Sequence, residues 1–328
     1  MSVIEHEGMT DETQEHISVP TELSSQTPLF VSEFMEGYSF RGIIDYLKLT
    51  NVTGAFIFSK GAIHYSQCDA TETILNNLEV RTPDLTHYQF GHDSPIAYGV
   101  NMNNIKQTMA VVGKKDGVRL LSYLTYPFLF IQHLGAGNDE ASKRNLSMVR
   151  IQSIDPVQMT VEGYKRSEND PNCTVRVQDF CKTCANIVRI KCDFVTIKGS
   201  PNGIRFQAMI DGNITGAYYE FGAYGKTSFE EETKNIQLKR LAEYLASLSL
   251  DVSSKPEPQQ SNGPKLVIKE PEELNTIRVK STYIKALSKL VNSFKEGTVK
   301  CYQEQSLPLK LIFNNTYCKL TVFLQNKK

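Results

Sequence analysis

Four short amphipathic segments recur along the chain, and they constrain its fold more than any other feature. They begin near Ser39, Asn101, Gln178 and Ser281, so that successive starts lie about 62, 77 and 103 residues apart. A long connection and an insertion account for the two larger intervals, which leaves a period of about 60 residues. Runs of alternating apolar and polar residues flank each segment. The sequence therefore predicts four copies of one unit, consisting of a strand, a helix and several antiparallel strands.

The segment after Asn101 shows the helical pattern in its simplest form. Ile105, Met109 and Val112 recur at the spacing that places side chains on one face of a helix. Lys106 falls on the opposite side, which is polar and mildly basic. The pattern predicts a short helix with one buried face and one solvated face.

In the first segment, Ser39 is expected to be the N-cap of a helix, because a serine hydroxyl accepts hydrogen bonds from the N–H groups of the first turn. The residues predicted to face the core are Phe40, Ile43, Ile44 and Leu47.

Composition and turn residues divide the 328 residues into several parts. Six acidic residues and no apolar core mark the start of the chain as a disordered tail. Stretches rich in Pro and polar residues mark a connection and an insertion. The predicted organisation is an acidic tail at 1–28, a first domain at 29–134, an edge strand and connecting loop at 135–172, and a second domain at 173–328 that contains the insertion at about 222–264.

Seven cysteines without a secretory signal predict reduced thiols in an intracellular protein. Cys173, Cys181, Cys184 and Cys192 fall within 20 residues, which makes a zinc site an alternative to consider. Cys181 and Cys184 lie inside a helical pattern that places Cys184 on the buried side. This placement favours core thiols over metal ligands. We therefore expect no metal and no cofactor.

Catalytic and membrane functions find little support. Gly225-Lys226-Thr227 resembles the end of a phosphate-binding loop, but Glu220 stands where such a loop needs its first glycine. The six histidines are scattered. No apolar run approaches the roughly 18 residues that a membrane span needs. We expect neither an enzyme nor a membrane partner.

The charges are balanced overall but not locally. Lys+Arg and Asp+Glu total 36 each, so net charge alone indicates no nucleic-acid partner. For any single helix, a solvated polar face explains the cations well. Four such faces in one layer, with Asp45 and Asp179 as the main acids, favour a surface that contacts DNA phosphates without reading bases. The candidate DNA-binding residues are Arg41, Lys48, Lys106, Lys114, Lys115, Lys182, Arg189, Lys191, Lys285, Lys289 and Lys295.

Several blocks in this order resemble the eukaryotic-type sliding clamp, proliferating cell nuclear antigen (PCNA). They are FRGIIDYLKL, AFIFSKGAIHYSQCDATETILNNLEV, YGVNMNNIKQTMAVVGKKDGV, VRVQDFCKTCANIV and TYIKALSKLVNSF. The Cys68-Asp69 pair falls where the family has an aspartate after its second strand, and Gly99-Val100-Asn101 matches the start of its second helix. The resemblance extends from about Leu29 to Leu324.

The resemblance implies an α+β fold of two tandem clamp domains, each made of two repeats, with the helices on one side of curved sheets. It implies a homotrimeric ring around double-stranded DNA that acts as a processivity factor for a DNA polymerase in replication and repair. The ring would be placed on DNA by a clamp loader and would work in the nucleus or, for a viral member, at the viral replication site. Heterologous contacts between two edge strands would close the ring. By position these edges are Asn145–Ile151 and Asn213–Phe221, with the interface residues Asn145, Ser147, Val149, Ile151, Asn213, Thr215, Ala217 and Tyr219.

The resemblance also implies an apolar pocket for a short peptide from partner proteins, beneath the connecting loop. The matching positions are Cys68, Met159, Val161, Pro308 and Phe323. The loop departs from the family pattern at Pro156-Val157 and at Thr160, and Cys68 is smaller than the apolar residue usual there. These departures predict a pocket of different shape.

Two other functions remain open. The insertion follows the Asn213–Phe221 edge and contains a predicted helix at 229–248, which would block ring closure if it covered that edge. The chain would then be a monomeric or dimeric processivity factor of the same fold. A scaffold that does not bind DNA is the third possibility.

Overall fold

Each half of the molecule contains two strand–helix–strand units. The computed structural model describes residues 26–135, 146–154, 170–210, 216–224 and 273–326. The first unit consists of β1 (Phe30–Phe34), α1 (Gly37–Thr50), β2 (Thr53–Phe58), β3 (Ala62–Cys68) and β4 (Ile74–Arg81), followed by the 3-10 turn η2 (Thr82–Asp84) and β5 (His87–Phe90). The second consists of β6 (Ile96–Asn101), α2 (Met102–Met109), β7 (Gly117–Ser122), β8 (Phe128–Leu134) and β9 (Leu146–Ile154).

The second half repeats this order. The third unit consists of β10 (Cys173–Arg176), α3 (Val177–Arg189), β11 (Phe194–Ser200), β12 (Gly203–Met209) and β13 (Gly216–Gly222). The fourth consists of β14 (Asn275–Lys280), α5 (Ser281–Leu287) with the 3-10 turn η6 (Ser288–Asn292), β15 (Thr298–Tyr302), β16 (Leu309–Asn314) and β17 (Cys318–Leu324). The predicted fourfold repeat and the α+β class are confirmed. Most of the predicted acidic tail, of the connecting loop and of the insertion lies outside the described residues.

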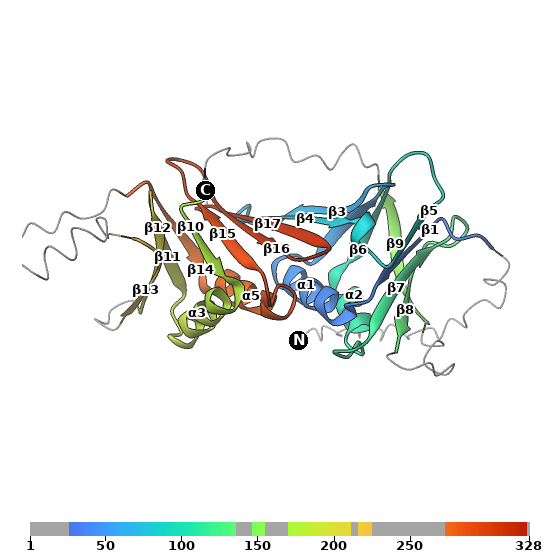
Figure 1. Ribbon diagram of the computed structural model, residues 1–328, viewed down its shortest axis with the longest axis horizontal. Coiled ribbons are helices and arrows are strands. Elements are labelled where there is room, and N and C mark those ends of the chain that lie inside the picture. Colours follow the sequence, from blue (N-terminus) through green and yellow to red (C-terminus); the bar gives the residue numbers. More distant parts are fainter. Residues whose placement is uncertain (1–25, 136–145, 155–169, 211–215, 225–272, 327–328) are drawn as a thin grey trace, which may run out of the picture.

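Within each half, the two units exchange strands. The strand before one helix pairs with the first strand after the other helix, so β1 pairs with β7 and β6 pairs with β2. The second half does the same with β10–β15 and β14–β11. Because all these pairings are antiparallel, the helices of a pair lie side by side and cover the same side of the sheets. Figure 1 shows α3, α5, α1 and α2 in one row, with the strands above them and at both ends.

The residues that the helical periodicity predicted to face the core are buried. Ile105 and Met109 of α2 are buried, and Val112 is buried in the turn that follows the helix. Asn101 caps this helix, since its side-chain oxygen accepts a hydrogen bond from the N–H of Asn103 at 2.9 Å. In α1 the residues predicted to face the core are all buried: Phe40, Ile43, Ile44 and Leu47.

The predicted N-cap of α1 is wrong, because Ser39 lies inside the helix. The helix begins at Gly37, and the Ser39 hydroxyl donates to the carbonyl of Ser293 at 3.0 Å and accepts from the Tyr317 hydroxyl at 3.0 Å. These contacts join α1 to the end of the fourth unit. Gly42 permits this approach, because a Cβ there would lie 2.3 Å from the Ser293 Oγ. Ser39, which was predicted to cap the helix, instead makes tertiary hydrogen bonds to residues far away in the chain. The local sequence could not indicate these bonds.

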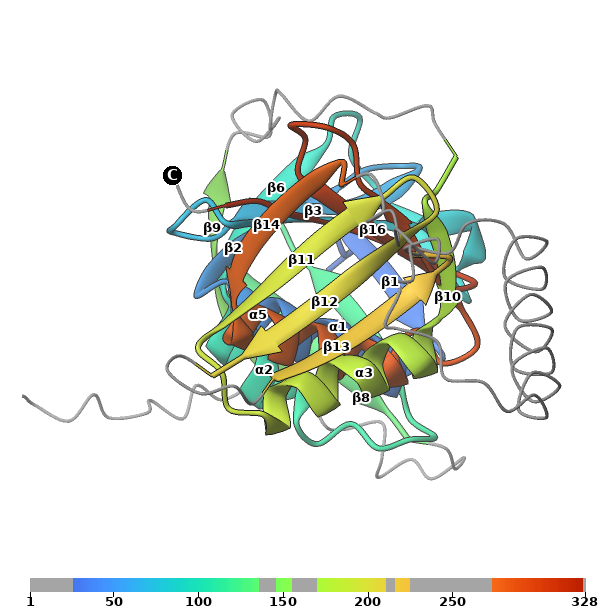
Figure 2. The ribbon, with the colours of Figure 1, turned by 90° about the vertical axis from the view of Figure 1, so that its left-hand side faces the viewer.

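One sheet runs through both halves of the molecule. Its 13 strands have the order β10-β15-β16-β17-β4-β3-β2-β6-β9-β8-β7-β1-β5. The halves meet where β17 pairs with β4, from Cys318 opposite Val80 to Leu324 opposite Ile74. A second sheet, β13-β12-β11-β14, closes the end formed by the second half (Figure 2).

The cysteines of the second half are core residues. Cys181 and Cys184 are buried in α3, and the Cys181 thiol donates to the Leu287 carbonyl at 3.4 Å. Burial raises the pKa of Cys181 to about 12. In the described part of the chain, no three metal-ligating side chains converge. Nor is any helix in that part long and apolar enough to cross a membrane.

Candidate functional site

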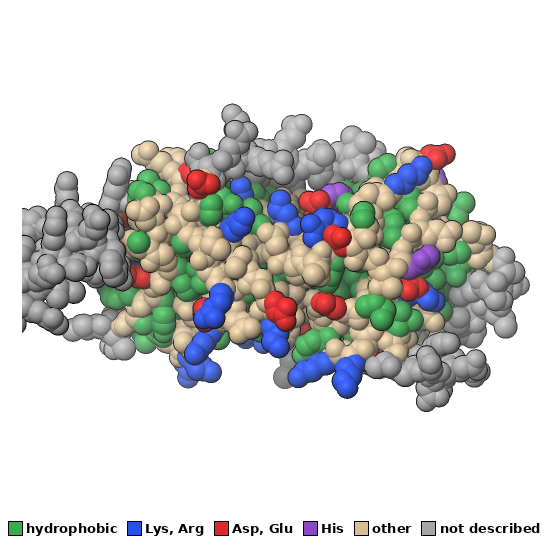
Figure 3. Space-filling view, in the orientation of Figure 1, with side chains coloured by type: hydrophobic (Ala, Val, Ile, Leu, Met, Phe, Trp, Pro, Cys, Tyr) green, Lys and Arg blue, Asp and Glu red, His purple; other side chains and the backbone are tan. Residues whose placement is uncertain are grey.

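The solvent side of the helical layer carries nine exposed cations. In Figure 3 blue side chains gather along the lower border of the molecule, where Figure 1 places the four helices. Such a concentration favours binding to a polyanion. The exposed residues are Lys106, Lys114, Lys115, Lys182, Arg189, Lys191, Lys285, Lys289 and Lys295.

The first unit contributes least to this surface. Arg41 is only partly exposed, and its guanidinium donates to the Val112 carbonyl at 2.8 Å and lies 3.8 Å from the Asp45 carboxylate. Arg41 therefore joins α1 to the end of α2, and its charge is partly compensated. Lys48 is also only partly exposed.

Acidic side chains near the layer are fewer than the cations. Asp179 forms an ion pair with Arg176 at 2.8 Å, which compensates its charge. Exposed carboxylates also adjoin the helices at Glu36, Asp193 and Glu296. The layer thus keeps a positive excess although the whole chain is neutral.

Two strand edges occupy equivalent places in the two halves. In the described part of the chain, β13 is the outermost strand of its sheet and pairs only with β12. β9 pairs with β8 over Leu146–Arg150, and beyond that it pairs with β6. Among the described residues, Leu146–Arg150 have no strand on the side away from β8. Of the predicted interface residues, Ser147, Val149, Ala217 and Tyr219 lie on these edges.

Ile151 does not lie on the open edge. It pairs with Val100 of β6, and its N–H donates to the Pro127 carbonyl at 3.0 Å. Its backbone is thus engaged within the chain, because β9 changes partner at this residue. Asn145, Asn213 and Thr215 lie outside the described residues.

Three of the predicted pocket residues lie near the junction of the two halves. Cys68 and Phe323 both stand opposite Leu75 of β4, one from each side, so the three share one face of the sheet. Pro308 comes directly before β16. Cys68, Pro308 and Phe323 are all partly buried. Met159 and Val161 lie outside the described residues.

A buried carboxylate beside Cys68 joins the two halves. Asp69 accepts hydrogen bonds from the N–H groups of Thr73 and Ile74 at 2.7 and 2.9 Å, and from the hydroxyls of Thr71 and Tyr283 at 2.5 Å each. Burial alone would raise its pKa, but these hydrogen bonds outweigh burial and lower it. Because Tyr283 belongs to α5, the ionised Asp69 stabilises the contact between the β3–β4 turn and the second half.

Comparison with known proteins identifies the fold. No family model matches the sequence. The crystal structure of PCNA from Entamoeba histolytica superimposes on 92% of this chain and 100% of that chain, with a TM-score of 0.61 and 15% sequence identity. The chain has the PCNA clamp fold. At this identity the likeness establishes the fold alone.

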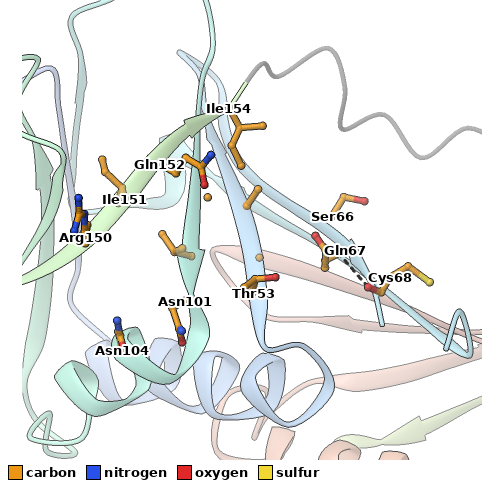
Figure 4. Close-up of a pocket in the computed structure, with 14 residues that line it drawn as sticks. Thr53, Ser66, Gln67, Cys68, Asn101, Asn104, Arg150, Ile151, Gln152 and Ile154 are labelled. Atoms are coloured by element: carbon orange, nitrogen blue, oxygen red, sulfur yellow. Dashed lines mark hydrogen bonds between the residues drawn. The ribbon is translucent and has the colours of Figure 1, made fainter. Parts of the chain in front are cut away.

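This PCNA-like chain also has a groove that no sequence pattern predicted. A groove of about 830 Å³ opens beside Cys68 and reaches β9. Figure 4 shows the side chains of Asn104, Arg150 and Gln152 around one part of it and that of Cys68 at the other. Residues from five elements form this groove, so no local pattern in the sequence could have indicated it.

Proposed function

We propose that this protein is a DNA sliding clamp that encircles duplex DNA and acts as the processivity factor of a DNA polymerase. The observation that carries the proposal is the single layer of four helices with nine exposed cations on its solvent side. Lysine dominates this set, and a lysine is a point charge on a flexible stem that contacts phosphates without reading sequence. Contacts of this kind hold DNA weakly enough for the clamp to slide. No catalytic step is required.

Ring closure follows from the open edges of β9 and β13. Inside the chain, the last strands of the first and fourth units pair as β4 and β17. The last strands of the second and third units are β9 and β13. We expect β13 of one copy to pair with Leu146–Arg150 of the next in the same manner. Such a head-to-tail contact closes into a ring when the rotation between copies fits, and the resemblance to PCNA implies three copies.

The clamp would recruit replication and repair proteins through the sheet around Cys68 and Phe323, and a clamp loader would open it. Partner peptides would dock beside the row Cys68–Leu75–Phe323 and Pro308. Aromatic or aliphatic anchors suit a partly buried apolar surface of this kind.

The decisive experiment combines charge reversal with a topological assay. We expect the wild-type clamp to remain on nicked circular DNA and to be lost after linearisation, because a ring slides off free ends. Lys285→Glu combined with Lys289→Glu should weaken retention at least tenfold and reduce the slope of log affinity against log salt by about 2. Lys300→Glu reverses an exposed charge on β15, outside the helical layer, and should retain DNA normally. Unchanged retention of the double variant would refute the assignment of the DNA surface.

A native mass measurement separates the ring from the other architectures. Three chains of 37.0 kDa give about 111 kDa. A second candidate, a monomeric or dimeric processivity factor, derives from the position of the insertion directly after β13. A monomer at micromolar concentration that still stimulates a polymerase would favour this candidate over the ring.

A further inference from the structure

The groove beside Cys68 exists because two neighbouring strands separate. β2 and β3 pair at Phe56–Tyr65 and towards their turn, but not at their other ends. There β2 continues along β6, with Thr53 opposite Asn101, while β3 continues along β4, with Cys68 opposite Leu75. The facing backbone edges of Thr53–Ala55 and Ser66–Cys68 are therefore not paired with each other.

The floor of the groove is made of small residues. Ala55 stands opposite Gly99, and both line the groove. A Cβ on Gly99 would lie 2.5 Å from the Cδ1 of Ile154, so a side chain at this position would displace the isoleucine of β9. Small residues here keep the groove open and give it an apolar base.

The walls are polar and carry a single kind of charge. Hydroxyls and amides come from Thr53, Ser66, Gln67, Asn104 and Gln152. Arg150 is exposed, and among the described residues it has no ion-pair partner and no carboxylate lines the groove. The chemistry that complements these walls is an extended chain with hydrogen-bonding groups and a negative charge.

The groove continues the surface proposed for partner peptides. Cys68 lines the groove, and it also belongs to the row Cys68–Leu75–Phe323 on the same sheet. A peptide anchored near Phe323 would therefore meet the groove as it crosses Cys68 towards β9. A continuous path of this kind requires an extended segment, because the strands beneath it diverge.

We propose that the groove binds the flank of an extended partner peptide and selects acidic residues there through Arg150 and the wall amides. This inference rests on the proposed function, because it extends the docking site of a clamp partner. It adds a specificity that the apolar anchor site alone does not provide: acidic flanks bind and basic flanks are rejected.

The test uses two fluorescent synthetic peptides with the same pair of aromatic anchors, flanked on one side by Asp and Ser or by Lys and Ser. The full-length wild type should bind the acidic peptide at least tenfold more tightly. Thr53→Glu places a negative charge on an exposed wall. Arg150→Glu reverses the charge of the arginine that lines the groove, but Arg150 also ends the open edge of β9, so this variant counts only if it keeps the mass of the wild type. Each variant should lose at least tenfold in affinity for the acidic peptide. Lys300→Glu should bind as the wild type does.

The cationic helical layer could attract an acidic peptide by itself, so Lys285→Glu combined with Lys289→Glu is the second control. It should bind the acidic peptide with unchanged affinity. If this double variant loses binding while Thr53→Glu keeps it, the peptide occupies the helices and the groove proposal is overturned. Equal affinity of the wild type for the two peptides overturns it as well.

Cys68 supplies an independent measurement. All seven cysteines lie in the described residues, and Cys68 is the one that is not buried. Bound acidic peptide should slow alkylation of Cys68 at least fivefold, and unchanged alkylation at saturating peptide would contradict the proposal. Because Thr53 is not one of the cations of the helical layer and lies neither on β13 nor on Leu146–Arg150, Thr53→Glu should keep the mass of the wild type and its retention on circular DNA. If Thr53→Glu keeps its mass and its retention on circular DNA but the peptide-binding results fail as described, the proposal for the groove is refuted and the proposed clamp function is not affected.

Discussion

The β4–β17 junction and the edges of β9 and β13 occupy equivalent positions in the repeat, yet among the described residues only the first is closed by a second strand. At the junction, seven residues of β17 stand opposite seven of β4, and Leu320, Val322 and Leu324 are fully buried. At the open edge of β13, Tyr218 is 60% exposed. The last strands of the first and fourth units, β4 and β17, therefore pair in a continuous sheet. The last strands of the second and third units, β9 and β13, each have backbone groups with no strand partner among the described residues.

Under the proposed function, the difference shows where a second copy of the chain would pair. Unpaired strand edges attract other strands, and native proteins usually cover them or blunt them with charge. On β13, Tyr218 and Glu220 both contact Arg205 of β12, which lies 5.6 Å from the Tyr218 ring centroid and 2.6 Å from the Glu220 carboxylate, so these two side chains are engaged with the strand on the paired side. The internal junction is thus a template for the contact that we expect between copies.

The largest effect on stability is expected for a substitution at the β4–β17 junction. Leu320 is fully buried opposite Leu78, so Leu320→Ala leaves a cavity in the sheet that joins the halves. We expect a loss of about 2–5 kcal/mol in the free energy of unfolding. Tyr218→Ala at the open edge should cost about 0.5 kcal/mol, as exposed substitutions usually do. Urea unfolding of the two variants at the same oligomeric state measures both values, and equal losses would contradict the comparison.

Paired proline substitutions test the open edge more directly. Successive N–H groups of a strand point to opposite sides, so one of Tyr218→Pro and Tyr219→Pro removes a hydrogen bond to β12, and the other faces the open side. The variant that removes the hydrogen bond to β12 should lose up to about 3 kcal/mol of stability, the upper end of the cost of leaving a buried hydrogen-bonding group unpaired. The variant whose substituted N–H faces the open side should remain folded. Its native mass should fall from about 111 kDa to the 37.0 kDa of one chain. If both variants keep the mass of the wild type, β13 is not the ring contact.

The smallest expected effect concerns the hydrogen bonds between the halves. The pKa of Asp69 is lowered in the folded chain, so the stability it contributes is present above its ordinary value of 3.8 and is lost as the pH falls through the folded pKa. Asp69→Asn should cost about 1–3 kcal/mol at neutral pH. It should also flatten the decline in stability between about pH 5 and pH 3. Urea unfolding across this range measures both effects.

Asp93→Asn is the matched control for this experiment, because Asp93 is fully exposed. It should keep both the stability and the acid dependence of the wild type. An Asp69→Asn protein with the acid slope of the wild type would show that Asp69 does not stabilise the contact with Tyr283.

Much of the fold could be predicted from local patterns. The spacing of Ile105 and Met109 identifies the buried side of α2, and the strand-like runs on either side of Lys60-Gly61 indicate the hairpin of β2 and β3. The roles assigned to single polar residues were less secure. Ser39 was expected at a helix end and instead binds Ser293, and Arg41, which is expected to face DNA, also donates to the Val112 carbonyl. In both cases the local sequence does not show the partner, which lies more than 70 residues away in the chain.

The candidate sites also differ in how far local sequence patterns indicate them. Exposed lysines on an amphipathic helix can be read from the sequence, because helical periodicity alone separates them from the core. The groove could not, because it depends on the point at which β2 leaves β3 and on the lack of a side chain at Gly99. The same holds for the hydrogen bond between Asp69 and Tyr283, which are far apart in the chain.

The sequence by itself determined the four units, the buried faces of their helices and the hairpins, since these depend on residues close together along the chain. Only the tertiary structure decided that β1 and β6 exchange partners, that β17 joins β4, and that β9 and β13 keep open edges. Strand pairing of this kind joins backbone groups whose hydrogen-bonding capacity is the same in every residue except proline. The choice of partner is therefore made by the packing of the whole sheet against the helices, and not by any segment alone.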